Sequence, residues 1–433
     1  MAQPEGQAAP PLAQQPSRRR TAAHASIKYA TAAVASRPCA AVGLHLKQSR
    51  KPRRGGGTAE LNRARNMADD AADRRVINVD AASMPSVVHV GSGLLEKIPS
   101  ELNPDNGIKA SKYVLVSDHN VWRLYGTRVT AAFHAAGYLT APPSSLGAFA
   151  VMNSCSCQAP DCTNLNTGEG GKKTLFCFQV PPGEGSKSRA TKNKIEDFMF
   201  ANRCNRDTCM LAFGGGVVGD LVGFVAATYM RGVPVVQIPT STTAMIDSSV
   251  GGKTAINVPA GKNLVGAFHQ PLLVYADMQL LQTLPRRELV EGIAEAIKMG
   301  CIRLKALFDL LESNVEKVMS LDKAVISEVI YDAVRMKAEV VTLDERESGI
   351  RSTLNFGHTI GHAIEALMSP QMMHGECVSV GCVAEAELAM ALGHTGMSRD
   401  KIERITKCFA SYGTRTNTVP IVSTLLPACM LPS

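Results

Sequence analysis

Short apolar runs alternate with amphipathic stretches along the first two thirds of the chain. Seven of these runs have the length and composition of strands: Val76–Val79, Val87–Val90, Tyr113–Ser117, Leu175–Val180, Cys209–Phe213, Val235–Pro239 and Leu272–Ala276. A helical pattern covers Asn120–Ala136 and Ser188–Asn202. Alternation of buried strands with helices predicts an α/β fold, a parallel sheet with helices on both faces.

Beyond Pro285 the pattern becomes almost wholly helical. A 3.6-residue period marks four stretches: Arg286–Leu311, Asp322–Leu343, His358–Leu367 and Glu376–Leu392. The change of pattern predicts an α/β domain over residues 67–280 and an all-α domain over residues 281–413, followed by a divergent tail over residues 414–433.

Residues 141–174 interrupt the α/β pattern with Pro, Ser, Asn and Gly. A loop this long is unusual inside a compact domain, so we expect an insertion that projects to solvent. Cys155, Cys157 and Cys162 lie within it, but they lack the paired spacing of zinc ribbons. Accidental clustering is therefore favoured over a metal site.

Charge divides the 433-residue chain into two parts. Residues 1–66 hold 12 of the 46 Lys and Arg residues and two acidic residues, so this leader has a net charge of +10. The whole chain has a formal net charge of +8, so the remainder has a net charge of −2. A basic, Ala- and Ser-rich, acid-poor leader is typical of an organellar transit peptide. We expect a plastid location, with a cytoplasmic protein bearing a disordered basic tail as the alternative.

Composition argues against two classes of partner. Tyr29 is the only aromatic residue among the charges of the leader, so we expect no nucleic-acid partner. No apolar run approaches the roughly 20 residues that span a bilayer, so we expect no membrane insertion. Twelve cysteines without a secretory signal indicate reduced thiols.

A glycine turn follows the strand predicted at Cys209–Phe213. Gly214–Gly216, Gly219 and Asp220 open a helical pattern there, and a helix N-terminus with close backbone approach suits a pyrophosphate. The alternative is a turn that only packs helix on strand. The next strand ends at Thr240, where the usual dinucleotide fold has an acid for the ribose.

A second polar segment, Asp247–Asn263, is expected to be irregular and glycine-rich. With Arg231, Lys253 and Lys262 it offers cations and backbone N–H groups suited to an anionic or polyhydroxylated ligand. An ordinary solvated loop is the alternative.

Three of the ten histidines fall within seventeen residues. His358 and His362 share one face of a predicted helix, His374 follows, and Glu295 and Lys298 share a face of another helix. A carboxylate with two or three imidazoles is typical of a catalytic first-row transition-metal site. A helical pair of histidines alone is more often structural, and it is the cluster of three that favours a site.

Six motifs now indicate a family. They are PPGEGSKS (Pro181–Ser188), GGGVVGD (Gly214–Asp220), MIDSSVGGKTAINVPAGKN (Met245–Asn263), EGIAEAIK (Glu291–Lys298), DERESGIRSTLNFGHTIGHAIE (Asp344–Glu365) and HGECVSVG (His374–Gly381). From about Val76 to about Gly413 the chain resembles the 3-dehydroquinate synthases, which are sugar phosphate cyclases of the shikimate pathway.

The resemblance implies an NAD-binding α/β domain, a helical metal-binding domain and a homodimer. It implies that zinc or cobalt is held by Glu295, His358 and His374. It assigns NAD to Asp118, Asn120, Glu184, Lys187, Gly215, Gly216, Asp220, Thr240, Ser241, Lys262 and Thr283. It assigns the substrate to Arg231, Asp247, Lys253, Asn263, Lys298, Lys337, Arg351 and Asn355, with Glu347 and His362 for proton transfer.

The implied reaction turns a sugar acid phosphate, 3-deoxy-D-arabino-heptulosonate 7-phosphate, into 3-dehydroquinate and phosphate, with catalytic NAD and no net redox. Three other functions remain open: a sugar phosphate cyclase with a different product, a metal-dependent alcohol dehydrogenase, and a truncated product without activity. The last arises because the resemblance stops after Gly413, before a family segment that carries a substrate lysine.

Overall fold

The computed structural model describes residues 74–141, 144–145, 172–394 and 396–417. The predicted leader, nearly all of the predicted insertion with its three cysteines, and the tail beyond Asn417 lie outside these residues. Within the described part, no helix combines the length and the apolar character needed to cross a membrane.

A nine-stranded sheet organises the N-terminal half of the described chain. Its strands are β1 (Arg75–Val79), β2 (Ser86–Gly91), β3 (Lys112–Asp118), β4 (Leu139–Thr140), β5 (Ser144–Ser145), β6 (Thr174–Val180), β7 (Thr208–Gly214), β8 (Val235–Pro239) and β11 (Leu273–Asp277). They run in the order β1-β2-β11-β8-β7-β3-β6-β4, with β5 also paired to β6. β1 is antiparallel to β2, and the other pairs are parallel.

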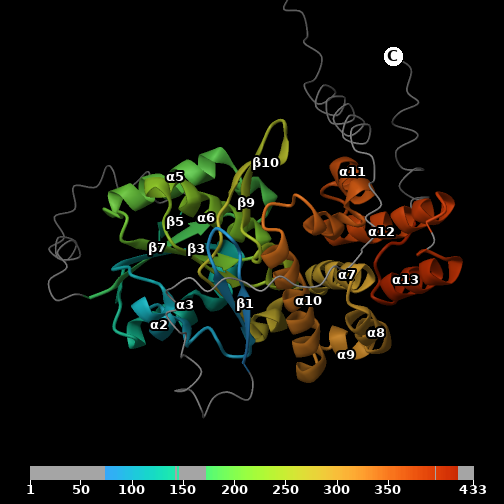
Figure 1. The fold of residues 1–433 in the computed structure, drawn as a ribbon. Coiled ribbons are helices and arrows are strands. Elements are labelled where there is room, and N and C mark those ends of the chain that lie inside the picture. Colours follow the sequence, from blue (N-terminus) through green and yellow to red (C-terminus); the bar gives the residue numbers. More distant parts are fainter. Residues whose placement is uncertain (1–73, 142–143, 146–171, 395, 418–433) are drawn as a thin grey trace, which may run out of the picture. The chain divides into compact units, whose positions relative to one another are not determined.

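Both faces of the sheet are buried against hydrophobic cores. Successive side chains of a strand point to opposite faces, so each strand contributes to both cores. On β3, Tyr113 and Leu115 enter one core, and Val114 and Val116 enter the other. The first core also contains α2 (Ile98–Glu101) and α3 (His119–Ala135), and the second contains α5 (Arg189–Ala201) and α6 (Gly216–Thr228). Figure 1 shows these two pairs of helices on opposite sides of the sheet.

From Arg286 onward the described chain is helical, apart from its turns. Its elements are α7 (Arg286–Ile302), α8 (Lys305–Ser313), α9 (Val315–Met319), α10 (Lys323–Leu343), a 3-10 segment η8 (Ile350–Asn355), α11 (His358–Met368), α12 (His374–Ala391) and α13 (Arg399–Ser411). The predicted α/β class and the helical C-terminal region are confirmed.

Two predicted elements differ from the structure. The stretch Arg286–Leu311 is two helices, because the chain turns back after Ile302. The second helix packs closely against the first, since a Cβ on Gly300 would lie 2.9 Å from the Phe308 backbone. The segment Asp247–Asn263 is not irregular throughout: a π-helical turn, η6 (Ala244–Ser248), leads into the antiparallel hairpin of β9 (Lys253–Val258) and β10 (Gly261–Phe268).

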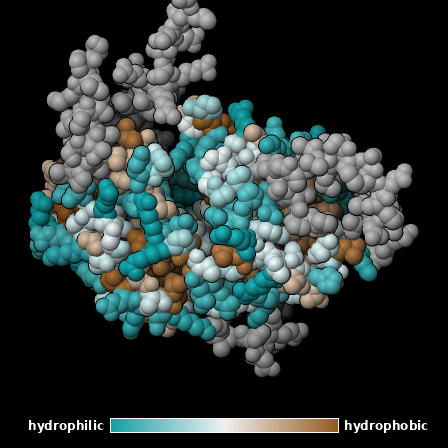
Figure 2. Space-filling view, turned by 180° about the vertical axis from the view of Figure 1, so that it is seen from behind, coloured by the Kyte–Doolittle hydropathy of each residue, from teal (hydrophilic) through white to brown (hydrophobic). Residues whose placement is uncertain are grey.

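One face of the structure shows how polar and apolar side chains are distributed on the surface (Figure 2). On the face shown in Figure 2, hydrophilic side chains predominate and hydrophobic ones form separate small groups. Large apolar side chains that remain exposed include Leu343 on α10 and Leu392 after α12. Single exposed side chains of this kind are ordinary on soluble domains.

Candidate metal and nucleotide site

The carboxyl ends of β3 and β7 form a switch point in the sheet. Asp118 ends β3 and caps α3, accepting hydrogen bonds from the backbone N–H groups of Asn120 and Val121. Gly215 follows β7 and is the N-cap of α6. The two helices leave toward opposite faces, which opens the crevice where open α/β sheets bind ligands.

Glycine serves two purposes in the turn after β7. A Cβ on Gly219 would lie 2.8 Å from Gln237 Oε1, so this glycine packs α6 on β8. At Gly215 a Cβ would meet only the side chain of Ser241, whose Oγ would lie 3.4 Å away, and Thr240 N donates to Gly214 O at 3.0 Å. The structural alternative holds for Gly219, while the turn itself brings Gly215 beside Ser241, two residues predicted to contact NAD.

A polar network lies beside the start of α6. The buried Lys187 ammonium donates to Asp220 and, at 2.5 Å, to Asn263 Oδ1. Burial raises the pKa of Asp220, and Lys187 opposes that rise. Asn257 joins the network, because its Nδ2 donates to Glu184 at 2.8 Å and its Oδ1 accepts from Asn263 N at 2.9 Å. Three residues predicted for NAD and one predicted for substrate are thus held together.

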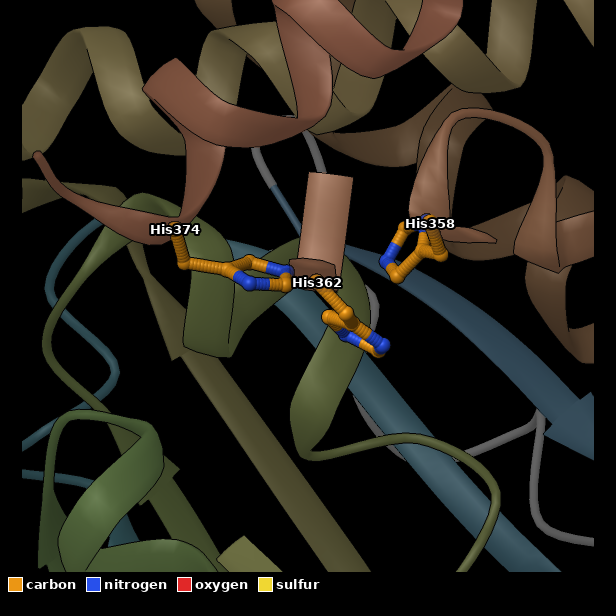
Figure 3. A group of neighbouring side chains, drawn as sticks. All are labelled: His358, His362 and His374. Atoms are coloured by element: carbon orange, nitrogen blue, oxygen red, sulfur yellow. The ribbon is translucent and has the colours of Figure 1, made fainter. Parts of the chain in front are cut away.

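The three predicted metal ligands meet although they come from three helices. Glu295 lies within α7, and His358 and His374 are the first residues of α11 and α12. Glu295 Oε1 is 3.7 Å from His358 Nε2 and 3.2 Å from His374 Nε2. Figure 3 shows His358, His362 and His374 converging on one region.

Glycines let these helices approach closely. Gly357 has φ +80° and sits before α11, and a Cβ there would overlap Cys382 Sγ on α12. A Cβ on Gly381 would overlap the Gly357 carbonyl, and one on Gly375 would overlap the Glu291 backbone of α7. Only residues without side chains fit here, so the helix spacing that joins the ligands depends on them.

Glu295 is fully buried, and its charge is held by its neighbours. Burial would raise the pKa of this carboxyl, but Lys298, His358 and His374 bring it well below its ordinary value. Lys298 Nζ lies 2.5 Å from Oε2, yet neither carboxylate oxygen has a hydrogen-bond partner of good geometry. A buried carboxylate with open acceptor positions beside imidazole nitrogens fits a divalent cation.

His362 belongs to the same cluster. One nitrogen from each of His358, His362 and His374 lies within 4.8 Å of the others, so the geometry also allows three histidine ligands. Desolvation, followed by the charges of His358 and His374, lowers the pKa of His362 to about 4, although part of the residue is exposed. His362 is therefore neutral near pH 7, as either a ligand or a proton acceptor requires.

Glu365 is a site residue that the sequence analysis did not single out. Its Oε2 lies 3.0 Å from His374 Nδ1, and its Oε1 accepts from Lys262 Nζ at 2.7 Å. Burial would raise its pKa, but His374 and Lys262 outweigh burial and lower it to about 2. A signal was present, because residues 358, 362 and 365 follow the helical spacing of one face.

Three lysines predicted for substrate each pair with an acidic residue of the site. Lys298 contacts Glu295, while Lys337 on α10 donates to the Asp247 side chain and carbonyl. Lys253 Nζ lies 2.5 Å from Glu347 Oε2. Asn355 Nδ2 donates to the other oxygen of Glu347 at 2.7 Å, so the proton-transfer candidate Glu347 is held between two predicted substrate residues.

A loop stabilised by Asp344 presents Glu347. The carboxylate of Asp344 accepts from the backbone N–H groups of Ser348, Gly349 and Arg351, and these bonds are the main reason that the Asp344 pKa falls to about 2. Glu347 has φ +60°, an unusual conformation for a residue other than glycine. The sequence analysis did not single out Asp344 either.

Three predicted residues have surroundings that the sequence did not indicate. Arg231 is exposed after the C-terminal end of α6, a 13-residue helix about 20 Å long, so it lies at the opposite end of that helix from the glycine turn. Arg351 is 1% exposed and donates to the carbonyls of Gly251 and Glu345. Thr283 contacts the Tyr125 hydroxyl at 2.6 Å.

Two family models match consecutive parts of the chain. The N-terminal 3-dehydroquinate synthase model matches residues 177–291, and the C-terminal one matches residues 292–431. The chain belongs to the 3-dehydroquinate synthase family. The family match runs past Gly413, so the tail after that residue falls within the matched region.

Solved structures of sugar phosphate cyclases resemble this 3-dehydroquinate synthase-like fold. A 2-deoxy-scyllo-inosose synthase complexed with carbaglucose-6-phosphate, NAD+ and Co2+ has a TM-score of 0.62 at 22% identity, covering 78% of this chain and 83% of that one. A 2-epi-5-epi-valiolone synthase from Streptomyces hygroscopicus subsp. jinggangensis, with NAD+ and Zn2+ bound, has a TM-score of 0.61 at 26% identity, covering 76% and 80%.

A more distant likeness marks the wider fold. A maleylacetate reductase from Rhizobium sp. has a TM-score of 0.51 at 14% identity, covering 80% of this chain and 89% of that one. Such a likeness shows the fold alone. Membership of the 3-dehydroquinate synthase family therefore favours a cyclase over an alcohol dehydrogenase.

Proposed function

We propose that this protein is a 3-dehydroquinate synthase, a lyase that converts 3-deoxy-D-arabino-heptulosonate 7-phosphate into 3-dehydroquinate and phosphate. The observation that carries the proposal is the cluster of the buried Glu295 with the partly exposed His358 and His374, flanked by Lys298 and His362. The shikimate pathway role and a homodimeric state belong to the same proposal.

The proposed cofactors are NAD and a divalent metal, zinc or cobalt. Glu295, His358 and His374 would hold the metal, and the turn at Gly215–Gly216 with Asp118 and Lys187 would hold NAD. When bound, the metal supplies a Lewis acid for a substrate hydroxyl, and NAD accepts a hydride and later returns it. Solved cyclases of similar fold contain NAD+ with Co2+ or Zn2+, which supports this assignment.

The cations of the site match the charges of this substrate. A small sugar acid phosphate carries a carboxylate and a phosphate, which repel each other. Lys253, Lys298 and Lys337 offset that repulsion from separate elements, β9, α7 and α10. One well-placed electrostatic donor is typically worth about 3 kcal/mol of barrier.

Proton transfer falls to Glu347 and His362. Burial would raise the pKa of Glu347, but Lys253 and Asn355 lower it, so Glu347 is ionised near pH 7 and able to accept a proton. His362 is neutral for the reasons given above. Phosphate elimination needs a base at the carbon next to the transient ketone, and both groups have the required charge state.

A second candidate is a sugar phosphate cyclase with another product. The observation in its favour is that the inosose and valiolone synthases described above share this fold. The inosose and valiolone products named for those enzymes differ from dehydroquinate in the substituents of the ring. The choice of substrate therefore distinguishes the candidates. A substrate without a carboxylate leaves the cation set only a phosphate to bind.

The deciding experiment measures phosphate release by purified protein with NAD+ and Co2+ or Zn2+. The substrates are the heptulosonate phosphate, glucose 6-phosphate and a seven-carbon ketose phosphate without a carboxylate. We expect release from the first alone, loss of release with a chelator, and 3-dehydroquinate as product. Release from another substrate supports the second candidate, and release from none supports an inactive product. Light scattering tests the proposed dimer.

A further inference from the structure

One carboxylate joins the metal cluster to the nucleotide side of the site. Glu365 on α11 accepts from Lys262 Nζ at 2.7 Å through Oε1, and its Oε2 lies 3.0 Å from His374 Nδ1. Its side chain is 14% exposed, and that of Lys262 is 45% exposed. We infer that Glu365 is a positioning residue that couples metal binding at His374 to nucleotide binding at Lys262, an inference that rests on the proposed function.

The contact with His374 determines which ring nitrogen faces the metal cluster. An ionised carboxylate only accepts hydrogen bonds, so His374 Nδ1 carries a proton when it bonds to Glu365. The other nitrogen, Nε2, faces Glu295 Oε1 at 3.2 Å. Such an outer carboxylate fixes the orientation and tautomer of a metal-binding imidazole, and its loss typically weakens metal binding about 10- to 100-fold.

The contact with Lys262 ties a different element to the same carboxylate. Lys262 lies on β10, in the hairpin that follows η6. The next residue, Asn263, accepts from Lys187 at 2.5 Å, and Lys187 donates to Asp220 near the start of α6. A continuous polar path therefore runs from His374 through Glu365 and the hairpin to the helix that begins at the glycine turn.

The sign of the coupling follows from electrostatics. A cation at His374 Nε2 makes the Nδ1 proton a stronger donor, which draws the charge of Glu365 toward Oε2. The hold of Oε1 on Lys262 weakens, and the metal charge also repels the lysine ammonium. Lys262 is then freer to meet the phosphates of NAD, so metal binding is expected to tighten NAD+ binding, and NAD+ to tighten metal binding by the same factor.

The test compares the full chain with three variants. Glu365→Gln removes the shared charge, and Lys262→Met removes the nucleotide-side partner. Glu328→Gln is the matched control, because Glu328 on α10 also pairs with a cation, Arg75, on half-exposed side chains outside the site. The measurements are Co2+ affinity by competition with a chromophoric chelator, NAD+ affinity by calorimetry with and without Co2+, and the visible spectrum of bound Co2+ as NAD+ is added to saturation.

In the wild type we expect Co2+ to tighten NAD+ binding by about 5-fold or more, the lower end of typical coupling. In Glu365→Gln we expect Co2+ affinity to fall about 10- to 100-fold. We also expect the factor by which Co2+ tightens NAD+ binding to approach one. In Lys262→Met we expect Co2+ affinity close to that of the wild type, and we expect Co2+ to tighten NAD+ binding by a factor near one. Glu328→Gln should match the wild type, and the change of the Co2+ spectrum on NAD+ addition should disappear in both site variants.

Two failures have different meanings. A wild type that binds neither Co2+ nor NAD+ contradicts the proposed function. If the wild type binds both, and Co2+ tightens NAD+ binding equally in the wild type and in Lys262→Met, the coupling alone is contradicted. Lys262 is half exposed, so its variant is expected to fold and this outcome remains decisive even if Glu365→Gln proves unstable. Wild-type Co2+ affinity in a folded Glu365→Gln protein also overturns the inference.

Discussion

The buried Lys337 and the partly exposed Asp247 form an ion pair between α10 and the π-helical turn η6. The ammonium of Lys337, whose residue is 6% exposed, donates to both the side chain and the carbonyl of Asp247. The two pKa values move in the same direction for different reasons: burial would raise that of Asp247, but Lys337 and Lys298 lower it, whereas burial lowers that of Lys337. Burial thus disfavours the charged form of Lys337, and the carboxylate of Asp247 stabilises it.

Removing that partner is expected to destabilise the protein. Asp247→Asn leaves a buried ammonium without a counter-charge, which typically costs about 3 to 5 kcal/mol. The double variant Asp247→Asn with Lys337→Met should recover part of the loss, because it removes the uncompensated charge. Urea unfolding measures both. If Asp247→Asn unfolds at the wild-type urea concentration, the pair is not the stabilising contact described here.

Metal content should distinguish His358 from His362. His358→Ala removes a ring 3.7 Å from Glu295, so we expect the purified variant to lose its metal. His362→Ala should keep nearly full metal and lose phosphate release, because we assign His362 to proton transfer. Elemental analysis after dialysis provides the measurement.

The opposite results are informative. Full metal in His358→Ala refutes the ligand assignment. Loss of metal from His362→Ala to the same extent indicates the three-histidine arrangement that the geometry also allows.

The sequence predicted the sheet well because its strands are buried on both faces. Continuous apolar runs such as Tyr113–Ser117 are a strong local signal, and the observed strand differs by one residue at each end. The hairpin of β9 and β10 was missed, since the glycines and polar residues of Asp247–Asn263 resemble a loop. Its exposed strand carries little apolar signal.

The site was only partly predictable from local patterns. The helical spacing of His358 and His362 is local, but Glu295 becomes a neighbour only through the packing of three helices. The residue types suggested a carboxylate with the histidines, and the family resemblance assigned Glu295 as a ligand. The family resemblance assigned Arg351 to the substrate, and the structure adds that its guanidinium donates to the backbone carbonyls of Gly251 and Glu345. Charge in a sequence does not reveal which partner a side chain finds.

Close helix packing predicts a glycine variant with a distant effect. Gly381→Ala places a methyl group against the Gly357 carbonyl, where backbone cannot easily give way. We expect a loss of about 1 to 3 kcal/mol, as for other overpacked sites, together with weaker metal binding, because α11 and α12 carry His358 and His374.

Gly396→Ala is the matched control for this variant, since a Cβ there would meet no atom within 4 Å. Thermal unfolding and metal titration of the two variants provide the comparison. Equal melting temperatures for Gly381→Ala and Gly396→Ala contradict the packing argument.

His89 predicts a loss of stability in mild acid. Its Nδ1 is occupied by Arg74, whose Nε and Nη2 lie 3.1 and 2.7 Å away, and Arg74 also pairs with Glu101. Burial and then the Arg74 charge lower the pKa of His89 from 6.5 to about 4. Between these two pH values the unfolded chain binds the proton and the folded chain does not, so stability is full above pH 6.5 and falls as the pH drops toward 4.

The size of this effect follows from the same shift. At about 1.4 kcal/mol per pKa unit, His89 accounts for about 3 kcal/mol of stability lost across that interval. His89→Gln keeps an acceptor for Arg74 but does not titrate, so its stability should fall less by about that amount. Other groups titrate equally in both proteins and cancel in the difference. Denaturant unfolding of both proteins at pH 7 and pH 4 gives the measurement, and parallel losses would show that the Arg74 contact does not keep His89 neutral.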